Sequence, residues 1–507
     1  MTHRHLPCLP LPSTKMPTEA VQTRPTPLPK LQLTIAVLVQ AAEGLSAFVI
    51  FPFIPQFVRD TGITGGDERK TGYWAGVLES IFFIAEFLSV YLWSIASDLF
   101  GRRPILILGP LGLAIALFGF GLSTTFTGLL VWRCVQGVFN GNIGVVKTIM
   151  VEPLPYQFAD KSNLAQAMSF IPIAWSAGTT LGPILGGVLS EPEIHFPALA
   201  DRFPLLKAHP YFLPCAAVGA MCLGIFFLAL LGFRETSPVI LARRKREREA
   251  KFGLPDALEP TPATGLLADS PETGYGATSE ESTTQNTTSS TANESIPTIR
   301  ELLVARLLIP LLNYGFFCFT QTAYQVLYPL MYSTSIPLGG LGLSPYQIGV
   351  IRGVWGVCNT IFQLFIAART IRLLGPRTAY IFAFANFAVC IGAYPAMSFF
   401  AQRAGMVDGV VWALVALQGV SNLFVSMSYA SVQMYIVTSS PRPSALSSTN
   451  SIAQMVSTIL RGLAPFPASA LFAYSLQKES QLVYIVLMVV VGLGICSSFL
   501  LPRRMKE

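Results

Sequence analysis

The sequence predicts an all-α membrane protein with twelve transmembrane helices in two six-helix bundles. Only 12% of the 507 residues are charged, and the mean hydropathy is +0.54. Soluble domains usually carry about 25% charged residues. Apolar stretches of roughly 20 residues, the length that crosses a bilayer, recur along the whole chain. They are expected near residues 33–57, 74–96, 104–122, 127–151, 164–189, 210–233, 304–332, 345–368, 378–400, 407–437, 446–474 and 481–502.

A long polar segment separates these stretches into two groups of six. Residues 33–233 are expected to form the first bundle and residues 303–502 the second. Residues 1–32 and 234–302 are expected to be disordered cytoplasmic segments, because their composition cannot bury enough apolar surface to fold. Residues 503–507 would be a short cytoplasmic tail.

The net charge of +7 is explained by where the basic residues lie. Most Lys and Arg residues outside the apolar stretches fall in the tails, the linker and the loops on one side of this topology. The positive-inside rule therefore places both termini in the cytoplasm. The basic character thus reflects a lipid bilayer, of the plasma or vacuolar membrane, rather than nucleic acid as the partner.

Metal binding, cofactor binding and catalysis receive no support from the sequence. The eight cysteines include no C-x-x-C pair, and none of the four histidines lies mid-membrane. Neither a disulfide framework nor a metal site is therefore expected. No phosphate-binding loop and no Ser/His/Asp constellation is present. We expect a monomer that is not an enzyme.

A short charged loop is expected between the second and third helices. Gly101 relaxes the backbone there, and Pro104 can begin the next helix. An Arg pair alone would fit a plain hydrophilic hairpin. One acid, one glycine and two arginines at this spacing form a more specific pattern than such a hairpin requires. The segment reads Trp93-Ser-Ile-Ala-Ser97-Asp98-Leu-Phe-Gly101-Arg102-Arg103-Pro104.

This loop resembles the signature between helices 2 and 3 of the major facilitator superfamily. Its form is similar to that of the zinc-induced-facilitator-like branch, with its fungal relatives and the drug/proton antiporters. Supporting segments begin at Ile63, Arg133 and Gly178, and a further one is Arg234-Glu235-Thr236. The resemblance covers residues 33–502. It implies two pseudo-symmetric bundles that work by alternating access.

The position of the charged loop in such a fold implies that this loop acts as a gate. Arg102 or Arg103 is expected to reach Glu152, at the end of the fourth helix. Asp98 is expected to face the N-terminus of the eleventh helix, near 444–448, where the helix dipole favours an anion. These contacts would hold the halves together while the cavity opens outward. The alternative is a loop that only signals topology.

The fifth helix carries a pattern that the resemblance identifies with the antiporter motif. Gly178, Gly182 and Gly186 are spaced by four residues, so they share one face and admit close helix packing. Pro183 can bend the helix, and Gly187 completes the motif. In the family this motif accompanies exchange rather than symport; the alternative is helix packing alone.

Acidic residues inside the expected spans are candidates for proton coupling. Glu43 lies near the middle of the first helix, and Glu79 and Glu86 share a face of the second. A buried carboxyl group can gain and lose a proton near neutral pH. Glu43 is our first choice as proton carrier. The alternative is that these acids only pair with Arg133 or Lys147.

Polar and aromatic residues at helical spacing are expected to line a central substrate cavity. Two of them, Arg352 and Arg461, suit an anionic or zwitterionic substrate, whereas interhelical hydrogen bonding is the alternative for any single residue. The candidates are Gln40, Arg133, Asn140, Lys147, Gln321, Tyr324, Arg352, Trp355, Asn359, Gln418, Asn422, Gln454 and Arg461.

The function that the sequence favours is proton-coupled antiport of a small organic solute out of the cytosol. A facilitated uniporter and a non-transporting nutrient sensor are the two alternatives. The sequence leaves the solute open among drugs, metal chelates, organic acids and amino-acid derivatives.

Overall fold

A computed structural model describes residues 30–142, 144–146, 149, 164–237, 240–241, 243–244, 246–247, 305–439 and 446–503. The described residues contain helices and no strand. The first half supplies α1 (Lys30–Phe48), α3 (Thr71–Phe100), α4 (Arg102–Gly121), α5 (Phe126–Asn140), α7 (Leu164–Val188) and α11 (Phe212–Gly232). The second half supplies α14 (Ala305–Ser333), α15 (Pro345–Phe362), α16 (Ala368–Leu374), α17 (Pro376–Ala404), α18 (Gly409–Val425), α19 (Met427–Thr438), α20 (Leu446–Leu463), α21 (Pro465–Gln477) and α22 (Leu482–Ser498).

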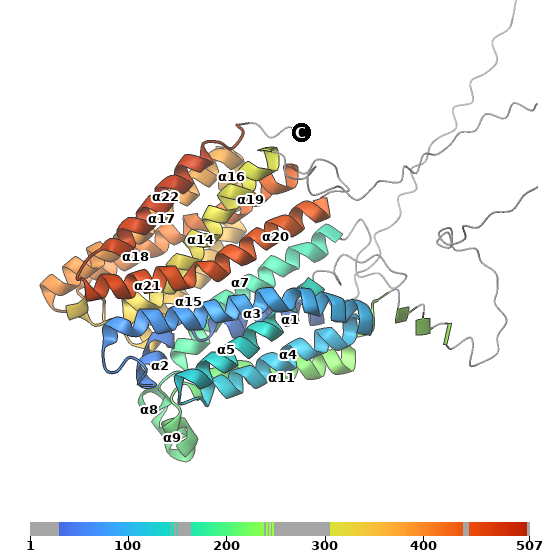
Figure 1. Ribbon diagram of the computed structural model, residues 1–507, viewed down its shortest axis with the longest axis horizontal. Coiled ribbons are helices and arrows are strands. Elements are labelled where there is room, and N and C mark those ends of the chain that lie inside the picture. Colours follow the sequence, from blue (N-terminus) through green and yellow to red (C-terminus); the bar gives the residue numbers. More distant parts are fainter. Residues whose placement is uncertain are drawn as a thin grey trace, which may run out of the picture.

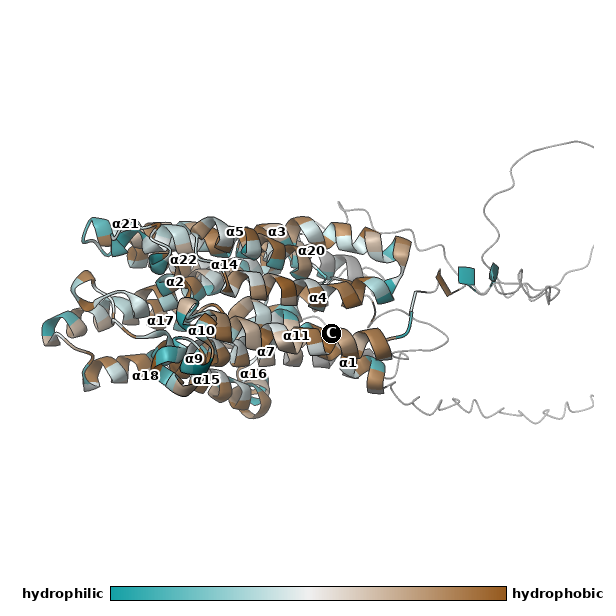
Figure 2. Cartoon of the chain, turned by 90° about the horizontal axis from the view of Figure 1, so that it is seen from below, coloured by the Kyte–Doolittle hydropathy of each residue, from teal (hydrophilic) through white to brown (hydrophobic). Residues whose placement is uncertain are grey.

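The helices lie side by side with their axes along the long dimension of the molecule (Figure 1). Each expected span overlaps with one of these helices or with consecutive helices of the described chain, and the last part of the fourth, after Asn140, lies partly outside the described residues. Eight helical segments of the described residues are long and apolar enough to cross a bilayer. Hydrophobic residues run along the helices, and hydrophilic ones gather near helix ends and connections (Figure 2).

Large apolar side chains on the outer surface show what surrounds the bundle. Leu231, Leu373 and Phe365 are 85%, 80% and 73% exposed. Helices that expose such residues along their length need an apolar solvent, because water would not tolerate so extensive an apolar surface. The protein is therefore a multi-pass integral membrane protein.

The two ends of the bundle differ in structure. We call the end where α1 begins and α3 meets α4 the tail end, and the other the opposite end. The opposite end carries α2 (Ile54–Asp60), η1 (Glu68–Lys70) and η2 (Ile336–Leu338). Three short helices lie there between α7 and α11, where the sequence suggested only a loop; α8 and α9 project at the lower left of Figure 1. They are α8 (Pro192–His195), α9 (Pro197–Arg202) and α10 (Pro204–Ala208).

Several expected spans are interrupted. The tenth breaks at Ser426 between α18 and α19, and the eleventh breaks before Pro465, a residue that favours the first turn of a new helix. The eighth contains a π-helical segment near its expected end, η3 (Gln363–Ala367), and continues beyond that end as α16. Such segments are frequent at functional sites.

Candidate functional site

A buried polar network lies inside the first half. Arg133 of α5 is 0% exposed, and its Nη2 donates to Glu79 Oε2 of α3 at 3.1 Å. Its Nη1 donates to Gln136 Oε1 at 2.7 Å, and Gln136 Nε2 donates to the carbonyl oxygen of Ser46 in α1 at 2.6 Å. The guanidinium also lies 4.1 Å from the centroid of the Phe82 ring. This network ties three helices together, and it gives Glu79 the basic partner that the sequence offered as an alternative to proton transfer.

Glu43 lies in α1, close to the Ser46 end of this network. Its side chain is buried, and Gln40 Nε2 donates to its Oε2 at 2.8 Å. Asn140, at the end of α5, is 0% exposed, and neither its amide nitrogen nor its oxygen has a hydrogen-bond partner among the described residues. In the described part of the first half, the buried carboxyl groups of Glu43 and Glu79 therefore lie among polar side chains.

Glu86 occupies a different position from Glu79, although both lie on α3. It is half-buried and interacts electrostatically with Arg133 of its own half and with Arg461 of α20. Arg461 is also half-buried. This acid therefore lies near the boundary between the two halves.

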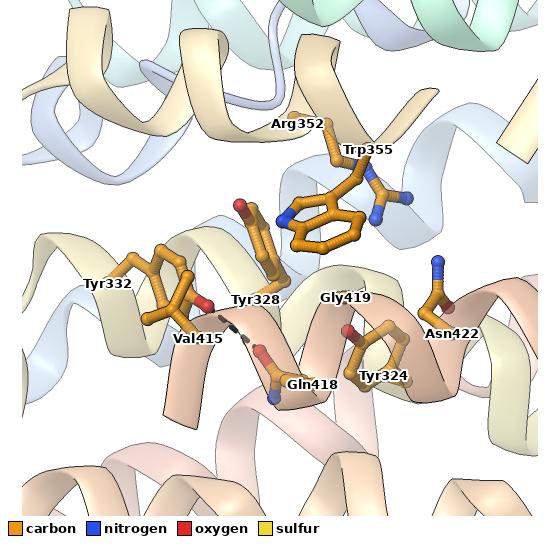
Figure 3. Close-up of a pocket in the computed structure, with 9 residues that line it drawn as sticks. All are labelled: Tyr324, Tyr328, Tyr332, Arg352, Trp355, Val415, Gln418, Gly419 and Asn422. Carbon is orange, nitrogen blue, oxygen red and sulfur yellow. Dashed lines mark hydrogen bonds between the residues drawn. The ribbon is translucent and has the colours of Figure 1, made fainter. Parts of the chain in front are cut away.

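A small pocket opens within the second half, between α14, α15 and α18 (Figure 3). Five of its lining residues were predicted as cavity residues from the sequence: Tyr324, Arg352, Trp355, Gln418 and Asn422. Tyr328 lies on the same polar stripe of the seventh expected helix as Tyr324, whereas Tyr332, Val415 and Gly419 were not predicted.

Hydrogen bonds and ring contacts fix the walls of this pocket. The Tyr332 hydroxyl donates to Gln418 Oε1 at 2.8 Å, and Gln418 Nε2 donates to the carbonyl oxygen of Cys390 at 2.7 Å. The rings of Tyr328 and Tyr332 lie 4.2 Å apart, and the Arg352 guanidinium lies 5.2 Å from the Tyr328 centroid. The pocket is thus aromatic with one cationic group.

The remaining predicted cavity residues do not line this pocket. Gln40, Arg133 and Asn140 belong to the buried interior of the first half. Gln321 and Asn359 are half-buried, and Gln454 is exposed on α20. Lys147 lies outside the described residues. The predicted cavity residues therefore divide into two separate groups, one in each half.

The glycines of the fifth helix pack as their spacing predicts. A Cβ at Gly178 would lie 2.7 Å from the backbone nitrogen of Leu45 in α1, and one at Gly182 would lie 3.1 Å from that of Val49. Gly186 also faces the Val49 backbone. This face holds α7 against α1 and lies beside the Glu43 region.

Gly187 turns toward the other half. A Cβ at this position would lie 2.6 Å from the Cα of Gly349 in α15 and 2.6 Å from the carbonyl oxygen of Pro345. Pro183 takes part in the same contact, because its carbonyl oxygen would lie 2.7 Å from a Cβ at Gly349. Two glycines thus bring helices of different halves into backbone contact.

The structure reduces the expected charged loop to Gly101, because α3 continues through Asp98 to Phe100 and α4 begins at Arg102. This corner at the tail end is organised by Glu235, which follows α11. Arg102 Nη1 donates to Asp98 Oδ1 at 2.6 Å and to the Ser97 hydroxyl at 2.8 Å. Glu235, just after α11, accepts backbone hydrogen bonds from Arg102 at 2.8 Å and Arg103 at 3.2 Å. The carboxylate therefore lies at the N-terminus of α4, where the helix dipole favours an anion. The expected partners of this loop, Glu152 and residues 444–448, cannot be compared because they or their side chains lie outside the described residues.

Gly101 allows this arrangement in two ways. Its φ of 102° lies in the region that side chains rarely adopt, and a Cβ there would overlap with the Glu235 carboxylate. Gly101, the residue before α4, therefore leaves room for the Glu235 carboxylate that caps this helix.

Replacing Glu235 with alanine is expected to destabilise the corner between α4 and α11. The change removes the acceptor for four backbone N–H groups, those of Arg102, Arg103, Thr236 and Ser237. Loss of a helix cap costs about 0.5–2 kcal/mol. The unfolding midpoint in detergent should fall, whereas Glu193→Ala, an exposed acid of α8, should leave it unchanged. An unchanged midpoint for Glu235→Ala would contradict the capping role.

Contacts that join the halves in the described residues lie at the opposite end and in the middle of the bundle. Ser335 N donates to Glu68 Oε1 at 2.9 Å, and Arg59 Nη2 donates to the carbonyl oxygen of Ser333 at 3.5 Å. His195 stacks on Tyr346 with centroids 4.5 Å apart. Nearer the middle, Phe466 N donates to the Ser80 hydroxyl at 3.1 Å. The Glu68, Arg59 and His195 contacts, together with the Gly187–Gly349 contact, hold the two halves together at the opposite end.

Some of these functional features could have been found in the sequence and others could not. Tyr332 continues the four-residue spacing of Tyr324 and Tyr328, so the stripe could have been extended to it. Arg234-Glu235-Thr236 was noted only as part of the resemblance, and the capping role of Glu235 carried no signal, because it depends on the backbone of Arg102 and Arg103 more than 130 positions away.

Comparisons with known proteins agree with this architecture. The family model described as Major Facilitator Superfamily matches residues 36–336. The chain is 28% identical to the major facilitator-type transporter psiT2 of Psilocybe cyanescens, over 95% of this chain and 92% of that protein. It is 27% identical to the efflux pump azaK of Aspergillus niger, over 94% and 89%. It is 26% identical to Protein ZINC INDUCED FACILITATOR 1 of Arabidopsis thaliana, over 93% and 91%.

Solved structures share the fold. An inward-facing, occupied bacterial homologue of the human lysosomal transporter Spinster has a TM-score of 0.61 at 12% identity, with 94% of this chain and 97% of that one covered. The fold, the paired helical halves and the family match lead to one conclusion. The chain belongs to the Major Facilitator Superfamily of membrane transporters, in the branch that includes zinc-induced-facilitator-like proteins and efflux pumps.

Proposed function

We propose that this transporter exports a small organic solute from the cytosol in exchange for protons. The observation that carries the proposal is the separation of two sites. Buried carboxyl groups lie in the first half, and an aromatic pocket with polar groups lies in the second. An exchanger needs a group that binds protons and a cavity that binds solute, and the two halves supply one each.

Glu43 is the residue we propose as the proton carrier. Glu79 is committed to a buried ion pair, because Arg133 Nη2 donates a hydrogen bond to its carboxylate at 3.1 Å. Glu43 is 1% exposed, and its carboxylate accepts a hydrogen bond from Gln40 Nε2 at 2.8 Å in the middle part of the first span. Intramembrane acids are costly, so their presence in a span marks them as candidates for a functional role.

The conformation fits one stage of an alternating-access cycle. The halves are held together at the opposite end by the contacts described above. With the tail end in the cytoplasm, as the distribution of basic residues suggests, this stage is inward-facing. We propose efflux through the plasma or vacuolar membrane. Its direction is supported by one relative, the efflux pump azaK of Aspergillus niger.

Proton movement in proteoliposomes tests the proposal. Purified protein is reconstituted around a pH-sensitive dye, and a panel of solutes is added with and without an imposed pH gradient. Solute-dependent proton movement should occur in the wild type, disappear in Glu43→Gln and persist in Glu193→Gln, an exposed acid outside the bundle interior.

Each other outcome rejects a part of the proposal. Solute flux that ignores both the gradient and Glu43 would indicate a uniporter. Proton movement that survives in Glu43→Gln would refute the assignment of the carrier. Binding of a solute without any flux would favour a sensor.

A further inference from the structure

The pocket in Figure 3 carries a positive charge that its own half does not balance. Arg352 is its one charged lining residue, and no Asp or Glu lines it. Between residues 305 and 503 the sequence contains only two acids, Asp408 and Glu479. Asp408 accepts a hydrogen bond from Val411 N at the start of α18, and Glu479 lies 3.7 Å from Arg69 at the opposite end. Neither acid is placed to neutralise Arg352.

The contacts of Arg352 also indicate that no acid of the described residues neutralises its charge. It is half-buried on α15, and the interaction that the structure shows for it is with the face of the Tyr328 ring. No carboxylate lies within ion-pair distance of it among the described residues. A cation at membrane depth is costly unless it is paired. A carboxylate on a ligand would supply the partner, and a guanidinium binds carboxylates through two parallel hydrogen bonds.

A second unsatisfied group lies in the same pocket. The hydroxyl of Tyr328 is buried, in a residue only 6% exposed, and has no hydrogen-bond partner among the described residues. Buried polar groups are nearly always hydrogen-bonded, so an orphaned hydroxyl in a binding pocket indicates a missing ligand or water. Gln418 differs, because Tyr332 and the Cys390 carbonyl satisfy its oxygen and its nitrogen. Gln418 therefore positions Tyr332, whereas Tyr328 is available to a ligand.

The walls of the pocket are flat and aromatic. Tyr324, Tyr328 and Tyr332 come from α14, and Trp355 faces them from α15 (Figure 3). The Trp355 indole lies directly against Gly419 of α18, where a Cβ would overlap with the ring. The absence of a side chain at Gly419 thus sets the position of Trp355. Aromatic walls in such an arrangement favour a planar ring over a saturated one.

We infer that this pocket binds an aromatic carboxylate. Its ring would lie between Trp355 and the tyrosines, and its carboxylate would bind the Arg352 guanidinium with the Tyr328 hydroxyl as a further donor. This inference rests on the proposed function, in that it names the class of solute that the transporter carries. It selects organic anions over cationic drugs, which Arg352 would repel.

Equilibrium binding to four small probes tests the inference without any transport. Protein in nanodiscs is titrated calorimetrically with benzoate, benzamide, benzylamine and cyclohexanecarboxylate. Benzoate should bind at least about tenfold more tightly than benzamide, because it gains charge-assisted hydrogen bonds. It should also bind more tightly than its saturated analogue, and benzylamine should bind most weakly. Equal binding of benzoate and benzamide, or no binding of benzoate, would overturn the inference.

Variants locate the site. In Arg352→Gln the preference for benzoate over benzamide should disappear, whereas Arg403→Gln, an exposed arginine near the end of α17, should keep it. Gly419→Ala should displace Trp355 and reduce the preference for benzoate over cyclohexanecarboxylate. A preference that survives in Arg352→Gln would place the anion elsewhere and overturn the assignment. If that variant fails to fold, the comparison of the four probes on the wild type still decides the ligand class.

The failure of this inference is distinguishable from the failure of the proposed function. Benzoate binding without solute-dependent proton movement supports the anion site and refutes proton exchange. Proton exchange driven by organic bases, with no benzoate binding, refutes the anion site and leaves the exchange intact.

Discussion

Replacing Arg133 with leucine is expected to lower the free energy of unfolding by about 3–5 kcal/mol, the usual cost of removing one partner of a buried ion pair. The change leaves Glu79 only 2% exposed without its cationic partner, and it frees Gln136 from the hydrogen bond that orients it. The measurement is the unfolding transition in mixed detergent and dodecyl sulfate micelles. Of the single substitutions whose effect on stability is predicted, Arg133→Leu should have the largest effect.

The double variant Glu79→Leu/Arg133→Leu should recover most of that loss. Replacing both members of a buried pair with apolar residues is often neutral, since no charge then remains to be desolvated. Arg403→Leu serves as the matched control, because that arginine is exposed. A double variant as unstable as the single one would show that the pair contributes more than charge compensation. Retained proton exchange in the double variant would make the pair structural and leave Glu43 as the carrier.

The sequence was sufficient to predict the fold because lipid imposes a simple condition on it. A segment that spans the membrane must be long, apolar and helical, since backbone groups have no water to bond with. That condition is visible one segment at a time. The interruptions at Ser426 and before Pro465, and the π-helical turn after Phe362, were not predicted. They depend on how neighbouring helices pack, which a single segment does not record.

The sequence predicted some residues of the candidate sites and missed others, for a related reason. Helical spacing marks residues that share a face, and it brought Tyr324, Arg352 and Gln418 into one set before the structure placed them around one pocket. Spacing does not show which face of a helix lines a cavity and which face packs against a neighbouring helix. Arg133 was therefore grouped with the cavity residues, although its side chain is committed to Glu79 in the interior of the first half.

A valine at Gly349 is expected to reduce transport strongly by preventing closure of the opposite end. A Cβ there would lie 2.6 Å from the Cα of Gly187, 2.7 Å from the carbonyl oxygen of Pro183 and 3.0 Å from the Gly187 nitrogen. These are all backbone atoms, so no side chain can rotate away. Overpacking costs about 1–3 kcal/mol, which shifts a two-state equilibrium by about 5- to 150-fold. The population should move toward conformations in which the opposite end is open.

Distances between spin labels measure that shift directly. Labels at Ile194 and Met406, which are 70% and 62% exposed at the opposite end, are attached in a background without reactive cysteines. Their separation should increase in Gly349→Val and stay unchanged in Gly492→Val, whose glycine on α22 has open space around it. Because the contact joins the halves and is not part of either interior, the unfolding midpoint should change little while solute flux falls. An unchanged label distance together with a large loss of stability would show that Gly349 supports the second half alone and takes no part in opening and closing.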